Sequence, residues 1–334
     1  MDADHLRASA QALEERLEGK RIGLLYPDPP PFIAAVTRTH IAEVLSEEKM
    51  MTVDLPFSSV EHLLRADFRQ AIDSCNMVCK IVHGSLNRSG VIQSILEYQN
   101  MPYTGQSLQT DLLSQNKLFV KSIMHSHNIP TPRYWQPDNR RTDDVPAEIE
   151  SQSSGWVAKP VDTNGSDGIV YLRDRAELHD FLDGMQSRQH RYFIEEYCPG
   201  RVMTVGVIPA GTALHTTAPM EYVLHEGCAI MDADWKQKPE RIAPADVPSA
   251  TAEIMELTAA SLHRAIGAEG VSRSDFILDT QGRIQTLEIN TNVGLSRIHD
   301  VPTALGTSRE RYRDLVLAHL GTALSKFPQQ HGNF

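Results

Sequence analysis

The chain contains little of what marks a metal-stabilised or disulfide-stabilised protein. It has four cysteines in 334 residues, Cys75, Cys79, Cys198 and Cys228, and none of them forms a CxxC pair. A zinc site needs closely paired Cys or His ligands, and the fourteen histidines are scattered without an HExxH cluster. We therefore expect four reduced thiols in a cytoplasmic protein.

Long apolar runs and an excess of positive charge are also absent. No segment approaches the roughly 20 apolar residues of a membrane span, and residues 1–19 lack the apolar core of a secretion signal. The net charge of −11 disfavours a nucleic-acid partner, because phosphate neutralisation needs clustered Lys and Arg. Leu6, Ala10, Leu13 and Leu17 share one helical face, which predicts a short amphipathic helix that packs on the first lobe or makes an oligomer contact.

The first third of the chain alternates short apolar runs with helical periodicity. The apolar runs predict strands at 21–26, 51–55, 77–82 and 101–104. The periodic segments predict helices at 32–49, 62–74 and 89–100. This alternation predicts a parallel, doubly wound α/β sheet, whose ligands lie at the carboxyl ends of the strands. His83 directly follows one of these strands and is therefore expected at the binding edge.

Further along, the pattern changes. A helix is predicted over 107–128, and strands at 156–159 and 169–172 enclose a loop that contains Gly and Ser. The backbone N–H groups of such a loop can wrap phosphate oxygens, although no GxxxxGK[ST] P-loop is present. We expect three lobes, with a leading helix in the first: 1–116, 117–200 and 201–334.

The most informative stretch is a predicted hairpin near residue 280. Asp275 opens its first strand, and Glu288 and Asn290, two residues apart, point to the same face of its return strand. Hard oxygen ligands of this kind suit Mg²⁺ that is held jointly with phosphates. Arg273 precedes Asp275 by two residues and shares its face. The alternative interpretation is a hairpin with a solvated acidic face.

These residues stand in an order that is typical of one family. From about Val82 to Leu320 the chain resembles the ATP-grasp superfamily, in its D-alanine–D-alanine ligase-like branch. The resemblance implies an α/β (α+β) fold with a parallel-sheet N-terminal lobe, a small ATP-binding central lobe and a mixed-sheet C-terminal lobe. The motifs that carry it are His83-Gly84, 101–105, Asn116-Lys117, 157–160, 165–168, Glu195, Gly200, 273–275 and 287–294.

The resemblance also implies a nucleotide site. Lysines from two lobes would contact the phosphates of ATP, a serine in the loop at 165–168 would donate to them, and a glutamate would hydrogen-bond the adenine amino group. A backbone group near Tyr197 would read the ring edge, and a further lysine on a second loop would reach a phosphate. The implied contacts are Lys117, Lys159, Ser166, Glu195, Tyr197 and Lys236.

The same resemblance implies metal and oxyanion groups. Asp275, Glu288 and Asn290 would bind Mg²⁺, with two ions expected. Arg273 and the backbone N–H of Gly294 would steady the oxyanion of a tetrahedral intermediate, and the catalytic set would include Ser166. A carboxylate is a poor acylating agent, so transfer of the γ-phosphoryl group to give an acyl phosphate, followed by attack of an amine, fits these parts.

The chain departs from the family where substrates would bind. Residues 26–31 read Tyr-Pro-Asp-Pro-Pro-Pro in place of a glycine-rich loop with a glutamate, Gly165 replaces a serine, and His299-Asp300 replaces a Ser-Leu pair. Val202 stands where a ribose-binding acid is common. We therefore expect an amino-acid-like substrate other than D-Ala plus D-Ala, as in specialised metabolism. The candidate substrate contacts are His83, Arg297 and His299.

Other functions stay open on the sequence alone. The same acyl-phosphate chemistry could amidate, cyclise or aminoacylate a carrier protein, and Arg133, Arg140 and Arg141 suggest a docking patch for such a carrier. A nucleotide-binding module without catalysis is the alternative from another class. The family further implies a homodimer.

Overall fold

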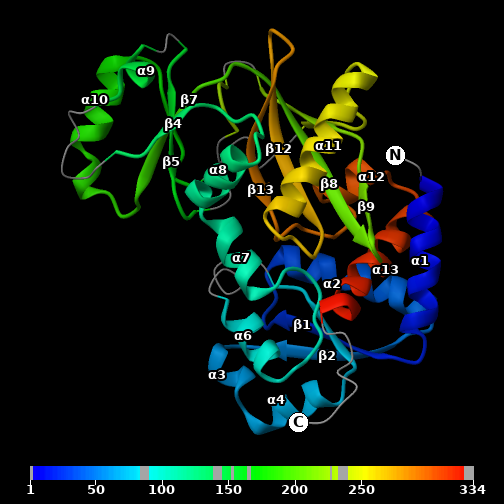
Figure 1. The fold of residues 1–334 in the computed structure, drawn as a ribbon. Helices are drawn as coiled ribbons and strands as arrows, with labels where there is room; N and C mark the ends of the chain where they lie inside the picture. The colour runs from blue at the N-terminus through cyan, green and yellow to red at the C-terminus, as the bar shows by residue number, and fades with distance from the viewer. Residues whose placement is uncertain are drawn as a thin grey trace.

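Three β-sheets build the molecule (Figure 1). The computed structural model describes residues 3–82, 90–137, 145–151, 154–163, 167–225, 228–231 and 240–326. The expected α/β ATP-grasp architecture is confirmed, because a parallel sheet, a small antiparallel sheet and a large antiparallel sheet follow one another along the chain. The expected lobe boundaries, at 116/117 and 200/201, stay predictions.

The first sheet is parallel, in the order β2-β1-β3. Its strands are β1 (Arg21–Pro27), β2 (Met51–Phe57) and β3 (Met77–Lys80). Its helices are α2 (Phe32–Glu47), α3 (Val60–Leu63), α4 (Ala66–Asp73) and α6 (Val91–Tyr98).

Two expectations for this lobe were wrong in detail. The helix predicted over 62–74 is two short helices, because Ser59 caps α3 and α4 starts anew after Arg65. The strand predicted at 101–104 is reduced to one bridge between Val78 and Tyr103.

The helix predicted over 107–128 is also two helices, α7 (Leu108–Gln115) and α8 (Lys117–Ser126). Asn116 separates them in an extended conformation, and its side-chain oxygen accepts hydrogen bonds from the N–H groups of Leu118 and Phe119. Asn is a strong N-cap because it satisfies N–H groups that have no partner within the helix. Lys117 thereby becomes the first residue of α8, in a fixed position.

The middle sheet is antiparallel, in the order β4-β7-β5-β6. Its apolar face packs on α10, with Trp156 and Ile194 in the core (Figure 1). The strands are β4 (Tyr134–Trp135), β5 (Trp156–Pro160), β6 (Val170–Leu172) and β7 (Tyr192–Glu196). The helices are α9 (Ala147–Glu150), α10 (Arg175–Asp183) and a 3₁₀ turn at Met185–Ser187.

The third sheet has the order β11-β10-β8-β12-β13, with β9 also paired to β8. Its strands are β8 (Gly200–Ala210), β9 (Ala213–Thr216), β10 (Met220–Val223), β11 (Glu240–Ile242), β12 (Ser272–Asp279) and β13 (Ile284–Asn290). The helices that accompany it are α11 (Ser249–Ala265), α12 (Asp300–Leu305) and α13 (Arg309–Lys326).

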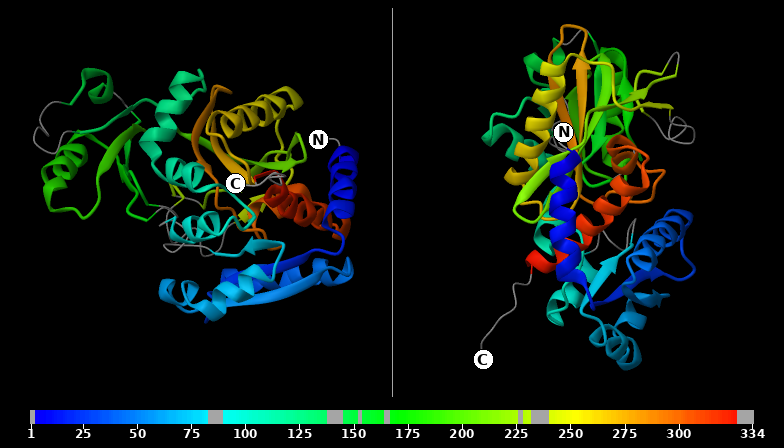
Figure 2. Two further views of the ribbon diagram at one scale, coloured as in Figure 1. Left: turned by 60° about the horizontal axis from the view of Figure 1, so that its bottom comes forward. Right: turned by 90° about the vertical axis from the view of Figure 1, so that its right-hand side faces the viewer.

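The leading helix α1 (Ala3–Leu17) runs alongside α13 (Figure 2). Its four predicted apolar residues are buried in one core with β1, α2 and α13. Leu13 lies directly over Gly321, where any larger residue would collide with it. The helix therefore packs on the C-terminal helix as well as on the first lobe. In the described part of the chain, no helix is long and apolar enough to cross a membrane.

Candidate active site

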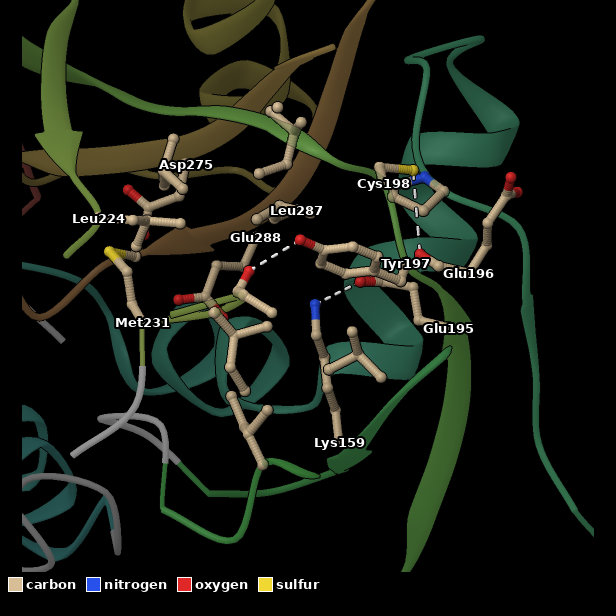
Figure 3. A pocket seen from close by; sticks show the side chains of 18 residues that line it. Lys159, Glu195, Glu196, Tyr197, Cys198, Leu224, Met231, Asp275, Leu287 and Glu288 are labelled. Carbon is tan, nitrogen blue, oxygen red and sulfur yellow. Dashed lines mark hydrogen bonds and ion pairs between the residues drawn. The ribbon is translucent and has the colours of Figure 1, made fainter. Parts of the chain in front are cut away.

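A cleft with about 790 Å³ of empty space, part of it open to solvent, lies between the middle sheet and the third sheet. β5 and β7 contribute Lys159 and Glu195 on one side, and β12 and β13 contribute Asp275 and Glu288 on the other (Figure 3). Between them the wall is largely apolar and includes Val202, Leu224, Met231, Ile277 and Leu287. A cleft that is largely apolar, with a few charged groups at its ends, suits a small organic ligand.

One buried glutamate on the middle sheet is held by two lysines. Glu195 is 1% exposed, and its two carboxylate oxygens pair with Lys121 from α8 and Lys159 from β5. Burial by itself raises the pKa of Glu195, but the two lysine charges outweigh it and hold the pKa below its usual range. Burial lowers the pKa of Lys121 in turn.

Lys117 reaches the same region from α8. Its backbone N–H donates to the carbonyl of Val161 at 3.0 Å, and its ammonium group donates to the carbonyl of Thr163. These contacts tie the first turn of α8 to the segment that follows β5. Lys117, Lys121 and Lys159 together exceed the single charge of Glu195, so this wall of the cavity carries net positive charge.

The side chain of Tyr197 lines the cavity (Figure 3). Its hydroxyl donates to the carbonyl of Ala229 at 3.1 Å, and its backbone N–H donates to the carbonyl of Gly155 at 3.0 Å. That N–H is therefore used within the fold. The N–H of Glu196 is also used, since it donates to the carbonyl of Arg133 at 2.8 Å. Cys198, which lines the same cavity, is therefore the better candidate for a backbone contact with a ring edge.

The predicted acidic face is present on β12 and β13. Asp275 pairs with Glu288, and Arg273 pairs with Asn290, across the two antiparallel strands. The Nδ2 of Asn290 donates to Asp275 Oδ2 at 3.2 Å and to Glu288 Oε1 at 3.1 Å. From β8, Thr204 Oγ1 donates to Asp275 Oδ1 at 2.7 Å. The alternative interpretation, a hairpin with a solvated acidic face, is wrong, because Asp275 is 3% exposed.

The two carboxylates respond differently to burial. Burial raises the pKa of Asp275, and the adjacent Glu288 charge adds to this rise against the opposing effect of Arg273. Burial acts in the same direction on Glu288, but the charges of Lys117, Lys159 and Arg273 prevail and lower its pKa to about 2. Glu288 is therefore ionised at neutral pH.

These residues fit magnesium. Two carboxylates and one amide lie on one sheet face, and N–H donors of Asn290 and Arg273 fill the space beside the carboxylates, as expected where positive charge is favoured. In the described segments no group of three or more His, Cys, Asp or Glu forms a metal site by itself.

Arg273 extends the charged face away from the cavity. Its Nε and Nη2 donate to Asp275 at 2.9 and 2.8 Å, and its Nη1 donates to Asp300 at 2.5 Å. Asp300, the first residue of α12, also forms an ion pair with Nε of Arg241 at 3.0 Å, and Tyr222 hydrogen-bonds it. Arg273 is thus held between two carboxylates.

The loop after β13 brings His299 onto Gly294. A methyl group at Gly294 would overlap the imidazole ring, so this close approach requires glycine. Arg297 lies on the other side of the loop, where its guanidinium stacks over the ring of Tyr312 at 4.0 Å from the ring centroid. Of these two substrate candidates, the structure brings His299, but not Arg297, to the Arg273–Asp300 pair.

Three candidates lie outside the described residues: His83, Ser166 and Lys236. Three further residues take part in the buried ion pairs of the two walls without having been expected from the sequence: Lys121, Arg241 and Asp300. Lys121 follows Lys117 by one helical turn, a spacing that could have indicated a shared face. Nothing in the sequence links Arg241 to Asp300, which lie 59 positions apart in number but form an ion pair.

The fold matches solved ATP-grasp ligases. A D-alanine–D-alanine ligase of Bacillus anthracis complexed with ATP superposes with a TM-score of 0.74 at 18% identity, over 92% of this chain and 99% of that one. The VanG D-Ala:D-Ser ligase of Enterococcus faecalis superposes with a TM-score of 0.73 at 16% identity, over 91% and 100%. Both comparisons show that the chain has the fold of these ligases.

Sequence comparison defines the family. A D-alanine–D-alanine ligase of Bordetella avium (strain 197N) is 29% identical over 254 residues, 73% of this chain and 77% of the relative. A D-alanine–D-alanine ligase of Streptococcus agalactiae serotype V is 29% identical over 280 residues, 81% and 77%. The family model described as D-ala D-ala ligase C-terminus matches residues 123–320, and the chain belongs to this family.

Proposed function

We propose that the protein uses ATP to phosphorylate the carboxylate of one amino acid and then joins it to the amine of a second, releasing ADP and phosphate. The observation that supports this most strongly is the opposition of charges across one cavity. Lys159 from β5 lies on one side, and Asp275 and Glu288 from β12 and β13 lie on the other. Lys117 from α8 lines an adjoining pocket together with Glu288. A triphosphate with its magnesium ions matches this arrangement.

Each part of the cavity then has a task. Lys117 and Lys159 bind phosphate oxygens, and Glu195 lies at the far end, where an adenine amino group could donate to it. Asp275, Glu288 and Asn290 hold Mg²⁺, which when bound neutralises charge on the transferred phosphoryl group. Arg273 and the Gly294 N–H steady the oxyanion that forms when an amine attacks the acyl phosphate, an effect worth roughly 3–4 kcal/mol per donor.

The identity of the amino acids is a finer question. The similar proteins named above are D-alanine–D-alanine ligases, which leans against the expectation that D-Ala plus D-Ala is not the reaction. We therefore propose D-alanine as the first donor to test.

One observation favours a different acceptor. Asp300 places a carboxylate beside Arg273, and its charge would repel a free carboxylate on the second substrate. Because Arg241 and Arg273 already neutralise Asp300, the repulsion is moderate, and both acceptor types deserve testing.

The test is ADP release with ATP, Mg²⁺ and a panel of D- and L-amino acids, singly and in pairs, with product masses. A condensation product of two amino acids, formed only with ATP, supports the proposal. If turnover is strongest with D-Ala plus D-Ala, the altered loops do not change the substrate specificity. Absence of ADP release with every pair contradicts the ligase itself.

The partner expectations rest on the family alone. A homodimer, a carrier-protein partner and a place in specialised metabolism stay predictions, and the product masses from the panel also separate dipeptides from amides and cyclic products.

A further inference from the structure

His299 occupies an unusual place at the start of a helix. It is the N-cap residue of α12, yet its side chain makes no capping hydrogen bond. Its imidazole instead turns back onto Gly294. Capping of α12 therefore does not explain the position of this ring.

The ring is held in one orientation. Its Nδ1 is 2.5 Å from the hydroxyl of Ser296, a fully buried side chain, and the backbone N–H of His299 donates to the carbonyl of Ser296 at 2.9 Å. Its Nε2 lies beside the backbone of Gly294. A contact that fixes Nδ1 leaves Nε2 as the nitrogen that can exchange a proton with a ligand.

The charges that face this ring come from three elements: Asp300 from α12, Arg241 from β11 and Arg273 from β12. Asp300 is committed to the two guanidinium groups and is a poor base, since they hold the pKa of this buried carboxyl below its usual range. Burial lowers the pKa of His299, and the two arginines add to this against the opposing effect of Asp300. The imidazole is therefore neutral at pH 7 and able to accept a proton.

The location matches a need of the reaction. Along the charged face the order is Glu288, Asp275, Arg273 and then Asp300 with its neighbour His299. Phosphoryl transfer belongs at the metal end, so the acyl phosphate would lie toward Arg273. An amine that attacks it must approach as a free base, because an ammonium group has no lone pair.

We propose that Nε2 of His299 is the general base that takes the proton from the ammonium group of the acceptor. This inference rests on the proposed ligase function and adds a residue to it. The N–H bond breaks and its proton moves to Nε2. The nitrogen lone pair then forms the C–N bond at the acyl carbon, and the C–O bond to phosphate breaks as phosphate leaves with the electron pair. The departing phosphate takes up the second proton that the nitrogen loses.

The test compares two acceptors in wild type and His299→Asn. Asparagine can keep a hydrogen bond to Ser296 but cannot act as a base. With an amino-acid acceptor, kcat is expected to fall about 10²-fold, in the range typical of general-base catalysis, and the acidic limb of the pH profile should disappear. Hydroxylamine is largely unprotonated at neutral pH, so its conversion to the hydroxamate should continue at the wild-type rate.

The matched control is His40→Asn, in α2, which contacts the loop that carries His299. His40 accepts a hydrogen bond from the N–H of Arg297 and packs edge-on against Tyr312, and its replacement should leave both rates within a few-fold of wild type. Hydroxamate formation by His299→Asn also proves that this variant is folded.

Two results would overturn the inference: an equal loss with hydroxylamine, which indicates a role in packing, or an unchanged rate with the amino acid. A failure of the ligase function is distinguishable, because wild type would then form neither ADP nor hydroxamate.

Discussion

The two sides of the cavity solve the burial of charge in opposite ways. On the middle sheet one carboxylate, Glu195, lies between two lysines, so the wall is positive. On the third sheet one guanidinium, Arg273, lies between two carboxylates, Asp275 and Asp300. In each wall, two side chains of one sign surround a central side chain of the opposite sign. The net charge that remains is positive on the middle sheet, which suits phosphates, and negative on the third sheet, which suits metal ions.

This comparison separates the parts of the site that the reaction constrains from the parts that can differ between ligases. Under the proposed function, the positive wall and the acidic face would bind groups that every ATP-dependent ligase shares, and both were indicated by motifs in the sequence. His299 and Asp300 depart from the family pattern in the sequence, and Asp300 pairs with Arg241 and Arg273 at the end of the charged face that lies away from the cavity. Variants that remove one charge from each wall test this division.

The largest effect is expected at the acidic face. Asp275→Asn keeps the shape of the side chain and removes its charge, so ADP release should fall about 10³-fold through weaker charge stabilisation. The measurement is steady-state ADP release at saturating ATP across a magnesium titration.

Asp279→Asn on the same strand is the control. Asp279 pairs with the exposed Arg283 at the hairpin turn, and its variant should stay within about two-fold, since it lies outside the charged face. Retention of a tenth or more of the wild-type rate by Asp275→Asn would show that this face does not hold the metal.

A smaller effect, on stability, is expected at the positive wall. Glu195→Leu leaves Lys121 and Lys159 buried without their common partner and should lower the free energy of unfolding by about 3–5 kcal/mol. Urea unfolding measures the change. Glu196→Gln is the matched control, because its half-exposed ion pair with Arg133 contributes about 1 kcal/mol or less. Equal losses in the two variants would mean that the wall is not a buried charge system.

Much of this architecture could be predicted from the sequence because its signals are local. The alternation of strands and helices in the first lobe and the spacing of Glu288 and Asn290 follow from side-chain periodicity. The break at Asn116 was missed although its cause is local, because the apolar pattern continues across it. A capping residue competes with that pattern and ends the helix.

The acceptor side could not be predicted for a different reason. Arg241 and Asp300 come together only when β11 and α12 pack beside the same strands, and no periodicity links such distant positions. The contact between the imidazole of His299 and the backbone of Gly294 likewise depends on tertiary packing. In the sequence, Gly294 is recognisable only as part of a family motif.

The contact between His299 and Gly294 gives the prediction with the smallest expected effect and the most specific test. Gly294→Ala places a methyl group in the imidazole of His299 and should lower the free energy of unfolding by about 1–3 kcal/mol, as overpacking does. In a His299→Ser background the same change should cost much less, because the ring is gone, and a double-mutant cycle by urea unfolding measures this coupling. Gly184→Ala, whose added methyl group meets only ordinary contacts, is the control and should be close to neutral. If the cost of Gly294→Ala is the same in both backgrounds, then the close approach of ring and backbone does not exist in solution, and the acceptor side is arranged differently from the rest of the site.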